Sequence, residues 1–218
     1  MYKKTLVIVA HQDDEALSCG CYILDRLRRG HRVTVVTVYG RVYDYGRQTV
    51  QETQSQQTSH FLRAKQVLGY QQSESFNLQE GEPSRVGYYA VLENLESLLQ
   101  SIGPDEVVIP SPFDLNQDHQ FLNGVCRVAL RSGALPRKPF RALECLAFDR
   151  THTHPNWFVP HNEADMSTKL AAVECYESEV RAYPHPRSAL KIRAQHEVWG
   201  GMVNTGLAEA YNLLLCKQ

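Results

Sequence analysis

The chain has 218 residues and a formal net charge of -1 at pH 7, and 43% of its residues are hydrophobic. This length and composition suit one compact domain with a sizeable core, so we expect a single domain over residues 1–218. Acidic and basic residues are interspersed without a long basic run, which argues against nucleic acid as a partner.

The cysteines and the apolar runs indicate a cellular compartment. The chain has 6 cysteines, with one Cys-x-Cys pair and no Cys-x-x-Cys, a spacing typical of neither a zinc ribbon nor a small disulfide-linked domain. The apolar run Thr5–Ala10 is too short for a signal peptide, and no apolar stretch reaches the roughly 18 residues of a membrane span. We therefore expect a cytoplasmic protein with reduced thiols and no membrane partner.

The first 40 residues predict a βαβ unit. Thr5–Ala10 is a continuous β-branched run, as expected of a strand buried on both faces of a parallel sheet. Ala16–Arg29 has apolar residues at helical spacing and ends in basic residues followed by a glycine. Arg32–Tyr39 repeats the strand pattern, so the crossover between the two strands should be right-handed.

Strand and helix patterns continue to alternate along the chain. Ala208–Leu215 fits a helix or a strand equally well. The alternation predicts a Rossmann-like α/β fold, with a mostly parallel sheet, helices on both faces and a ligand site beyond the carboxyl ends of the strands. The other expected elements are the helices Val50–Gly69, Val86–Ile102, about Asp118–Arg131 (with Asp118 as candidate cap), Ser167–Glu179 and Ser188–Gly200, and the strands Ser75–Leu78, Glu106–Pro110 and Arg141–Phe148.

A cluster of ionisable residues directly follows the first strand. His11, Asp13, Asp14 and Glu15 stand where this fold places its ligand site. Three adjacent carboxylates repel one another unless a cation, a helix N-terminus or hydrogen-bond donors compensate their charge. They therefore indicate either a metal ion or, in the simpler interpretation, only the favourable acidic start of the next helix.

A second cluster, Asp114–His119, follows the strand Glu106–Pro110 and so should lie at the same edge of the sheet. One histidine from each cluster plus one carboxylate gives three metal ligands and leaves a coordination position for water, as in catalytic zinc sites. The two clusters together favour the metal interpretation over helix capping.

Several segments carry a resemblance to a known family. Ala10–Glu15, which reads Ala-His-Gln-Asp-Asp-Glu, resembles the Ala/Pro-His-Pro-Asp-Asp-Glu motif of the LmbE-like, or PIG-L, N-acetylglucosaminyl deacetylases. Pro110–His119 is similar to the second family motif, which ends in Asp-His. Lys169–Glu179 and Gly201–Tyr211 resemble two later family segments, so the likeness spans almost the whole chain.

The resemblance implies a zinc-dependent hydrolase that removes the N-acetyl group from a small N-acetylated amino sugar or its conjugate. The lack of a membrane span and the polar loops at the sheet edge further predict a water-soluble substrate. The metal ligands carried over from the family motif are His11, Asp14 and His119, with one Zn²⁺ per chain. The implied general base is Asp13, which would take a proton from water and return it to the departing amine. Glu15 would support this site from outside the ligand set.

The chain departs from the family pattern in places that bear on the substrate. Asn116 replaces a histidine of the second motif, and an amide cannot shuttle a proton. Gln57 and His60 stand where the family often has an arginine and a glutamate. The remaining candidates for substrate contact or support are Asn116, Asp114, Asp118 and Arg41, the last beside Tyr43, Tyr45 and Arg47. His152 and His154 fit either additional contacts to metal or sugar or, in the simpler interpretation, an exposed loop.

Two other classes of protein share some of these features. A 2-His-1-carboxylate iron enzyme uses the same ligand types, although such enzymes usually build on a β scaffold. A non-catalytic Rossmann-type binding module would fit the strand and helix pattern, but Gly-x-Gly-x-x-Gly is missing after the first strand. The sequence leaves the exact substrate and the formation of a homo-oligomer open.

Overall fold

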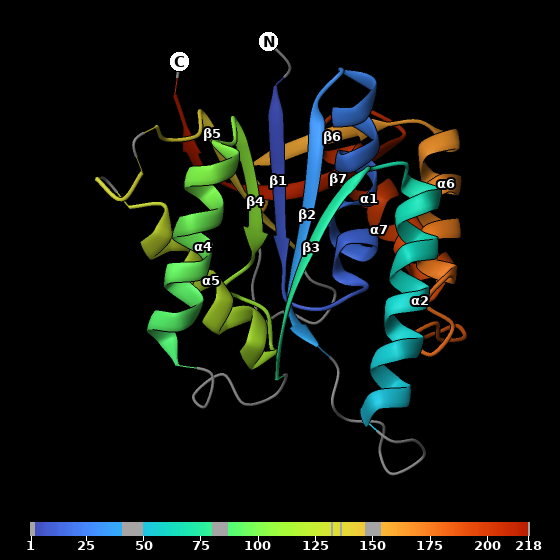
Figure 1. Cartoon of the computed structure of the whole chain (residues 1–218). Coiled ribbons are helices and arrows are strands. Elements are labelled where there is room, and N and C mark those ends of the chain that lie inside the picture. The colour runs from blue at the N-terminus through green and yellow to red at the C-terminus, as the bar shows by residue number, and fades with distance from the viewer. Residues whose placement is uncertain are drawn as a thin grey trace.

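A computed structural model describes residues 3–40, 50–79, 87–131, 133–135, 137–146 and 154–217 of the chain. It forms a 7-stranded sheet with helices packed on both faces (Figure 1). The candidates Arg41, Tyr43, Tyr45, Arg47 and His152 lie outside the described residues. Within the described part, no helix combines the length and apolar character needed to cross a bilayer.

The sheet is mostly parallel, as the sequence predicts. Its order is β3-β2-β1-β4-β5-β7-β6, and among the strands described β7 alone runs opposite to the others, so its pairings with β5 and β6 are antiparallel. The parallel neighbours β1 and β4 bring the segments that follow them to one edge of the sheet. The strands are β1 (Lys4–Val9), β2 (Arg32–Gly40), β3 (Gln72–Gln79), β4 (Glu106–Pro110), β5 (Arg141–Cys145), β6 (Trp157–His161) and β7 (Leu207–Cys216).

The helices form two layers. Figure 1 shows α4 and α5 on one face of the sheet and α1, α2 and α6 on the other. Alternate residues of β1 supply both cores: Leu6 and Ile8 pack with α4 and α5, whereas Val7 and Val9 pack with α1 and α2. The helices are α1 (Asp14–Arg28), α2 (Val50–Leu68), α4 (Tyr88–Ile102), α5 (Gln117–Ala129), α6 (Glu163–Glu174) and α7 (Ala189–Met202).

The carboxy-terminal third differs most from the sequence prediction. The prediction omits β6, a short edge strand whose Pro160 weakens the strand signal. Ala208–Leu215, left undecided, lies within strand β7. Helix α6 begins earlier than expected, because Asn162 and Asp165 form a capping box, and it ends at Glu174 rather than Glu179.

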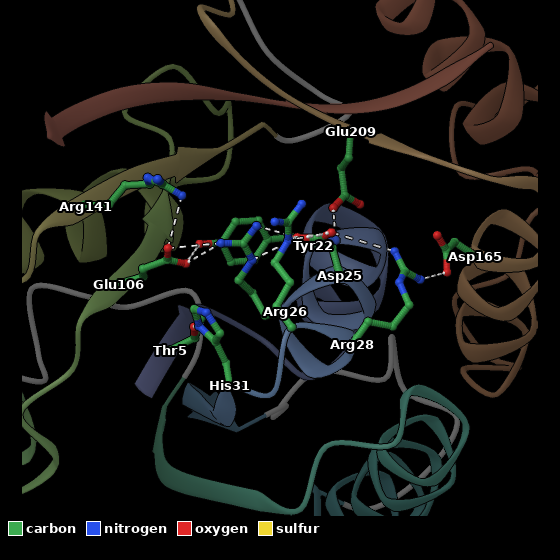
Figure 2. A network of polar contacts seen from close by, with 11 residues as sticks. Thr5, Tyr22, Asp25, Arg26, Arg28, His31, Glu106, Arg141, Asp165 and Glu209 are labelled. Carbon is green, nitrogen blue, oxygen red and sulfur yellow. Dashed lines mark hydrogen bonds and ion pairs between the residues drawn. The ribbon is translucent and has the colours of Figure 1, made fainter. Parts of the chain in front are cut away.

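A buried ionic network holds α1 at the amino ends of the strands (Figure 2). Glu106, which is 1% exposed at the start of β4, accepts hydrogen bonds from Tyr22 Oη at 2.5 Å, Arg26 Nη1 at 3.0 Å and Arg141 Nη1 at 3.1 Å. The network joins α1, β4 and β5. It lies at the end of the strands opposite to the one that His11 follows.

Candidate metal centre and active site

Three potential metal ligands meet at the carboxyl edge of the sheet. His11 directly follows the end of β1, Asp14 begins α1, and His119 lies in the first turn of α5. His11 Nδ1 is 3.1 Å from His119 Nε2 and 3.5 Å from Asp14 Oδ2, and His119 Nε2 is 3.2 Å from the same Asp14 oxygen. The structure thus brings together the three residues that the family resemblance implies as ligands.

A carboxylate stands behind each histidine. His11 Nε2 is 3.0 Å from Asp118 Oδ2, and His119 Nδ1 is 2.5 Å from Asp114 Oδ2. A neutral imidazole that donates its proton to such a carboxylate presents a bare lone pair at its other nitrogen. Both bare nitrogens then face each other and an oxygen of Asp14. Three electron pairs converge on one point, which is unfavourable unless a cation lies between them.

The spacing of the three atoms fits a zinc ion. In a tetrahedral site with bonds of about 2.0–2.1 Å, two ligand atoms lie about 3.3 Å apart. The observed separations of 3.1, 3.2 and 3.5 Å bracket this value. Two imidazoles and one carboxylate are a ligand set typical of zinc hydrolases, and three protein ligands leave a position for water or substrate.

The charges around these residues also favour a cation. Burial lowers the pKa of His11, but Asp118 and Asp14 outweigh this effect and raise it to about 9. Burial raises the pKa of Asp14, yet His119 and His11 outweigh it and hold that pKa well below its usual range. The surrounding carboxylates therefore attract positive charge to the point where the ligand atoms meet.

Asp13 lies beside this cluster in an unusual conformation. Its φ of 137° is one that non-glycine residues seldom adopt. Its side chain makes no capping hydrogen bond to α1, although its carbonyl oxygen accepts from the amides of Ala16 and Leu17. Instead, Asp13 Oδ2 accepts a hydrogen bond from Arg187 Nη1 at 3.1 Å. The capping interpretation therefore does not account for this carboxylate.

The environment of Asp13 makes its carboxylate more basic. Burial and the charge of Asp14 raise its pKa to about 6, while Arg187, His11 and His119 oppose the shift. A carboxylate with this pKa is ionised at neutral pH and accepts a proton more readily than an exposed aspartate does.

Glu15 supports Asp13 from the first turn of α1. Its Oε2 accepts a hydrogen bond from the backbone N–H of Asp13 at 3.1 Å, and its Oε1 accepts one from Tyr176 Oη at 2.5 Å. Burial raises the pKa of Glu15 to about 8, even though the hydrogen bond from Tyr176 opposes the shift. The Glu15 carboxylate therefore holds the backbone of Asp13. Glu15 itself lies outside the group of potential metal ligands.

The second motif forms an ordered start to α5. Asn116, and not Asp118, is the cap of this helix: its Oδ1 accepts a hydrogen bond from the backbone N–H of Asp118 at 2.8 Å. Asp114 in turn accepts one from the N–H of Asn116 at 2.9 Å. The expectation that Asp118 caps the helix is wrong, because Asp118 is the second residue inside α5. Its side chain points to His11 instead.

Two positions at which the chain departs from the family pattern lie on α2. Gln57 and His60 are buried on α2, where Gln57 Nε2 donates to Ser178 Oγ at 3.2 Å and the His60 ring meets the edge of Tyr176 at 6.3 Å. His154 belongs to neither group of potential metal ligands found among the described residues.

Arg187 contacts the candidate site although no sequence pattern marks it. Its Nη1 lies 3.1 Å from Asp13 Oδ2 and 3.5 Å from Glu179 Oε2, so it links the candidate base to the segment after α6. It stands far from both motifs in the sequence, directly before Ser188 at the start of α7. No spacing signal connects one loop arginine to an aspartate 174 positions earlier.

Comparisons with solved structures show that the whole fold recurs. N,N'-diacetylchitobiose deacetylase from Pyrococcus horikoshii is 18% identical, with a TM-score of 0.82 over 97% of this chain and 84% of that one. The zinc-inhibited form of teicoplanin deacetylase Orf2 is 16% identical, with a TM-score of 0.75 over 96% and 97% of the two chains. GalB, the 4-carboxy-2-hydroxymuconate hydratase from Pseudomonas putida KT2440, is 17% identical, with a TM-score of 0.76 over 99% and 98%.

At these identities the likeness establishes the fold, and the hydratase shows that the fold alone does not fix the reaction. A search of curated proteins finds no match. The model of one protein family, PIG-L, described as GlcNAc-PI de-N-acetylase, matches residues 6–130. This range covers more than half of the chain and includes His11, Asp14 and His119. The chain therefore belongs to the PIG-L family, as the motifs of the sequence indicate.

Proposed function

We propose that this protein is a zinc-dependent N-deacetylase that hydrolyses the acetyl amide of an N-acetylated amino sugar or its conjugate. The observation that carries the proposal is the convergence of His11 Nδ1, Asp14 Oδ2 and His119 Nε2 within 3.5 Å, beside the buried carboxylate of Asp13. The family match and the deacetylases among the solved structures support the same reaction.

The ligands would hold one Zn²⁺, whose Lewis acidity acidifies water and polarises an amide carbonyl. Asp13 accepts the proton of the attacking water and then delivers it to the nitrogen as the C–N bond breaks, which releases acetate and a free amine. Arg187 holds the Asp13 carboxylate in place through the 3.1 Å contact. Asp118 and Asp114 fix the ring orientation of His11 and His119.

The alternatives find less support in the structure. The sheet is mostly parallel and carries helices on both faces, unlike the β scaffold expected of a 2-His-1-carboxylate iron enzyme. A binding module without catalysis leaves unexplained why a carboxylate as buried as Asp13, which is 6% exposed, stands next to three potential metal ligands. Hydration, the reaction of one neighbour, would also use an activated water, so the test must detect the amine itself.

The experiment is an assay of free amine and acetate over a panel of N-acetylated sugars. The panel contains N-acetylglucosamine, N,N'-diacetylchitobiose and glucosaminides with either soluble or lipid aglycones, and the N-acetylated amino acids serve as non-sugar controls. We expect equal amounts of amine and acetate from at least one soluble sugar, loss of turnover after chelation and recovery with Zn²⁺. Full turnover in metal-free protein, or turnover of only the membrane-presented glycolipids, would contradict the proposal.

A further inference from the structure

A second group of potential metal ligands lies where α1, β6 and α7 meet. Cys21 is on α1, His161 is the last residue of β6, and His196 is on α7. The Cys21 Sγ and one ring nitrogen of each histidine lie within 4.8 Å of one another. Cys21 stands seven residues beyond Asp14, about 10 Å further along the same helix. This cluster is therefore separate from the candidate active site.

We propose that Cys21, His161 and His196 form a second metal site that binds Zn²⁺. A thiolate and two imidazoles are ligands that zinc prefers, whereas magnesium and calcium require oxygen ligands. The three residues come from segments far apart in the sequence, so no short sequence motif indicates the site. Three protein ligands leave the fourth coordination position to water or to an external ligand.

Burial and orientation suit the two histidines to this role. His196 is 1% exposed, and burial holds its pKa well below the usual value, so the ring is neutral as a metal ligand must be. Burial also lowers the pKa of His161. His161 Nδ1 lies 3.3 Å from the carbonyl oxygen of Asn162, which can accept its proton and leave Nε2 bare. That bare nitrogen is the one directed at His196.

The charges next to the cluster balance each other. Lys169 Nζ and Glu209 Oε1 form a buried ion pair at 2.6 Å, and Glu209 also accepts hydrogen bonds from the backbone N–H groups of Cys21 at 3.3 Å and Tyr22 at 2.7 Å. Figure 2 shows Glu209 extending from β7 toward α1. The positive charge of a bound ion would therefore add to a locally neutral environment, and the Cys21 thiolate would offset part of it.

Metal binding requires three local changes. His161 Nε2 and His196 Nδ1 now share a hydrogen bond at 2.7 Å, whereas two nitrogen ligands of tetrahedral zinc stand about 3.3 Å apart. The rings must therefore separate slightly, and His196 must carry its proton on Nε2. Burial raises the pKa of the Cys21 thiol well above its usual value, so binding must also release this proton to solvent as the sulfur–zinc bond forms.

The competing interpretation is a structural one, in which two histidines share a hydrogen bond next to a small core cysteine. Cobalt substitution distinguishes the two, because a Co²⁺ ion bound by thiolate gives a sulfur-to-metal charge-transfer band in the near ultraviolet. The candidate active site has no cysteine among its three ligands. The band would therefore report the second site alone, whether or not the protein deacetylates any sugar.

The test measures zinc stoichiometry and the cobalt spectrum of the full chain and of matched variants. We expect two Zn²⁺ per chain and the charge-transfer band in the unchanged protein. Cys21→Ser should lower the stoichiometry to one and abolish the band. Cys19→Ser removes a cysteine that is equally buried on the same helix but outside the cluster, and it should change neither.

His161→Gln provides a second variant at a less buried position in case Cys21→Ser does not fold. It should weaken zinc binding at this site at least tenfold and alter the cobalt band. No charge-transfer band, a band that survives Cys21→Ser, or a zinc content that Cys21→Ser leaves unchanged would overturn the proposal and leave the hydrogen-bonded histidine pair as the explanation of the cluster. A single Zn²⁺ per unchanged chain that is lost in Cys21→Ser would support this site and count instead against the proposed active-site ion.

Discussion

Asp13 combines a buried carboxylate with a backbone conformation that L-residues seldom adopt. Such conformations cost roughly 1–3 kcal/mol and persist where the surrounding structure holds them in place. Here the restraints are the Glu15 carboxylate on the Asp13 amide and the α1 amides on its carbonyl oxygen. Asparagine tolerates positive φ better than alanine does, so Asp13→Asn removes the charge with the least disturbance of the backbone.

Variants of the site should separate the metal ligands from the base. His11→Ala, Asp14→Ala and His119→Ala each remove a ligand, so each should lose zinc affinity and recover some turnover in excess zinc. Asp13→Asn should keep the metal but lose roughly a hundred- to ten-thousand-fold in turnover, the usual contribution of a positioned base. Bound metal and turnover are measured for all four variants.

The same measurements can contradict these assignments. Near-normal turnover in Asp13→Asn would remove Asp13 from the role of base. Full metal occupancy with normal turnover in His119→Ala would remove His119 from the ligand set. Because Asp13 and Asp14 are adjacent and chemically alike, only their different geometry in the structure predicts that the two variants fail differently.

At the scale of elements, the start of α5 positions His119. Asn116 caps this helix through its Oδ1, which leaves its amide NH₂ as the group able to donate to a substrate oxygen. Asn116→Ala removes both functions and should cost about 1 kcal/mol of stability and roughly tenfold in turnover. Asn116→Asp keeps the capping oxygen but has no NH₂ group, so it should retain stability and lose turnover.

Chemical denaturation and steady-state kinetics of the two Asn116 variants check this prediction. If Asn116 only caps the helix, Asn116→Asp would retain full turnover, and the proposed contact with substrate would be wrong. If the two variants lose equal stability, the cap seen at Asp118 N–H contributes little.

A buried ion pair joins the two later segments that resemble the family. Lys169 of α6 is 0% exposed, and its Nζ donates to Glu209 of β7 at 2.6 Å and to the Leu17 carbonyl oxygen of α1 at 2.5 Å. A Cβ at Gly20 would come within 2.9 Å of Lys169 Cγ, so the close approach of α1 and α6 requires glycine there. These residues join α1, α6 and β7 and do not belong to the group of candidate ligands His11, Asp14 and His119.

Lys169→Met should therefore destabilise the protein strongly. It leaves Glu209 buried without its ion-pair partner, a change that typically costs about 3–5 kcal/mol. Lys169→Met/Glu209→Gln should regain part of this loss, because the uncompensated charge is gone. Lys191→Met, at an exposed lysine of α7, is the control and should change the free energy of unfolding little. Equal unfolding free energies for Lys169→Met and Lys191→Met would refute the argument.

At the scale of the whole molecule, the sequence predicts the amino-terminal half best. Its buried strands β1, β2 and β4 consist mainly of Val, Ile, Leu and Thr, and a parallel sheet with helices on both faces accounts for such runs. The carboxyl edge of this sheet then brings His11 and His119 together although they are 108 positions apart. The two histidines meet because β1 and β4 are parallel neighbours, so the segments that follow them lie at the same edge of the sheet.

The parts that could not be predicted depend on long-range contacts without a local pattern. β6 contains Pro160 and has only one antiparallel neighbour, β7, among the described strands, so neither periodicity nor length marks it. Arg187 reaches Asp13 from a loop, and Cys21 meets His161 and His196 only after β6 and α7 have packed on α1. Such contacts are properties of the folded chain and leave no spacing signal.

We expect changes at the amino ends of the strands to lower stability without lowering turnover, because the candidate active site lies at the opposite end of the sheet. Glu106 binds Arg26, Arg141 and Tyr22 at the amino ends of the strands, away from the candidate active site (Figure 2). Glu106→Gln leaves Arg141 without its anionic partner, whereas Arg26 keeps its contact with Asp25. Because a buried charge then loses its partner, we expect a loss of up to about 3–5 kcal/mol in the free energy of unfolding. Zinc content and turnover at a temperature where the variant remains folded should stay unchanged.

A neighbouring ion pair supplies the matched control for this prediction. Asp105 precedes Glu106 and pairs with Arg137, whose side chain is 67% exposed. Exposed pairs contribute about 0–1 kcal/mol, so Arg137→Gln should scarcely change the unfolding transition. Denaturant titration and amine release are compared for both variants. A fall in the turnover of folded Glu106→Gln, with normal zinc content, would contradict this prediction. It would mean that α1 transmits the change at Glu106 to Asp13 and Asp14, so that the two ends of the sheet are not independent.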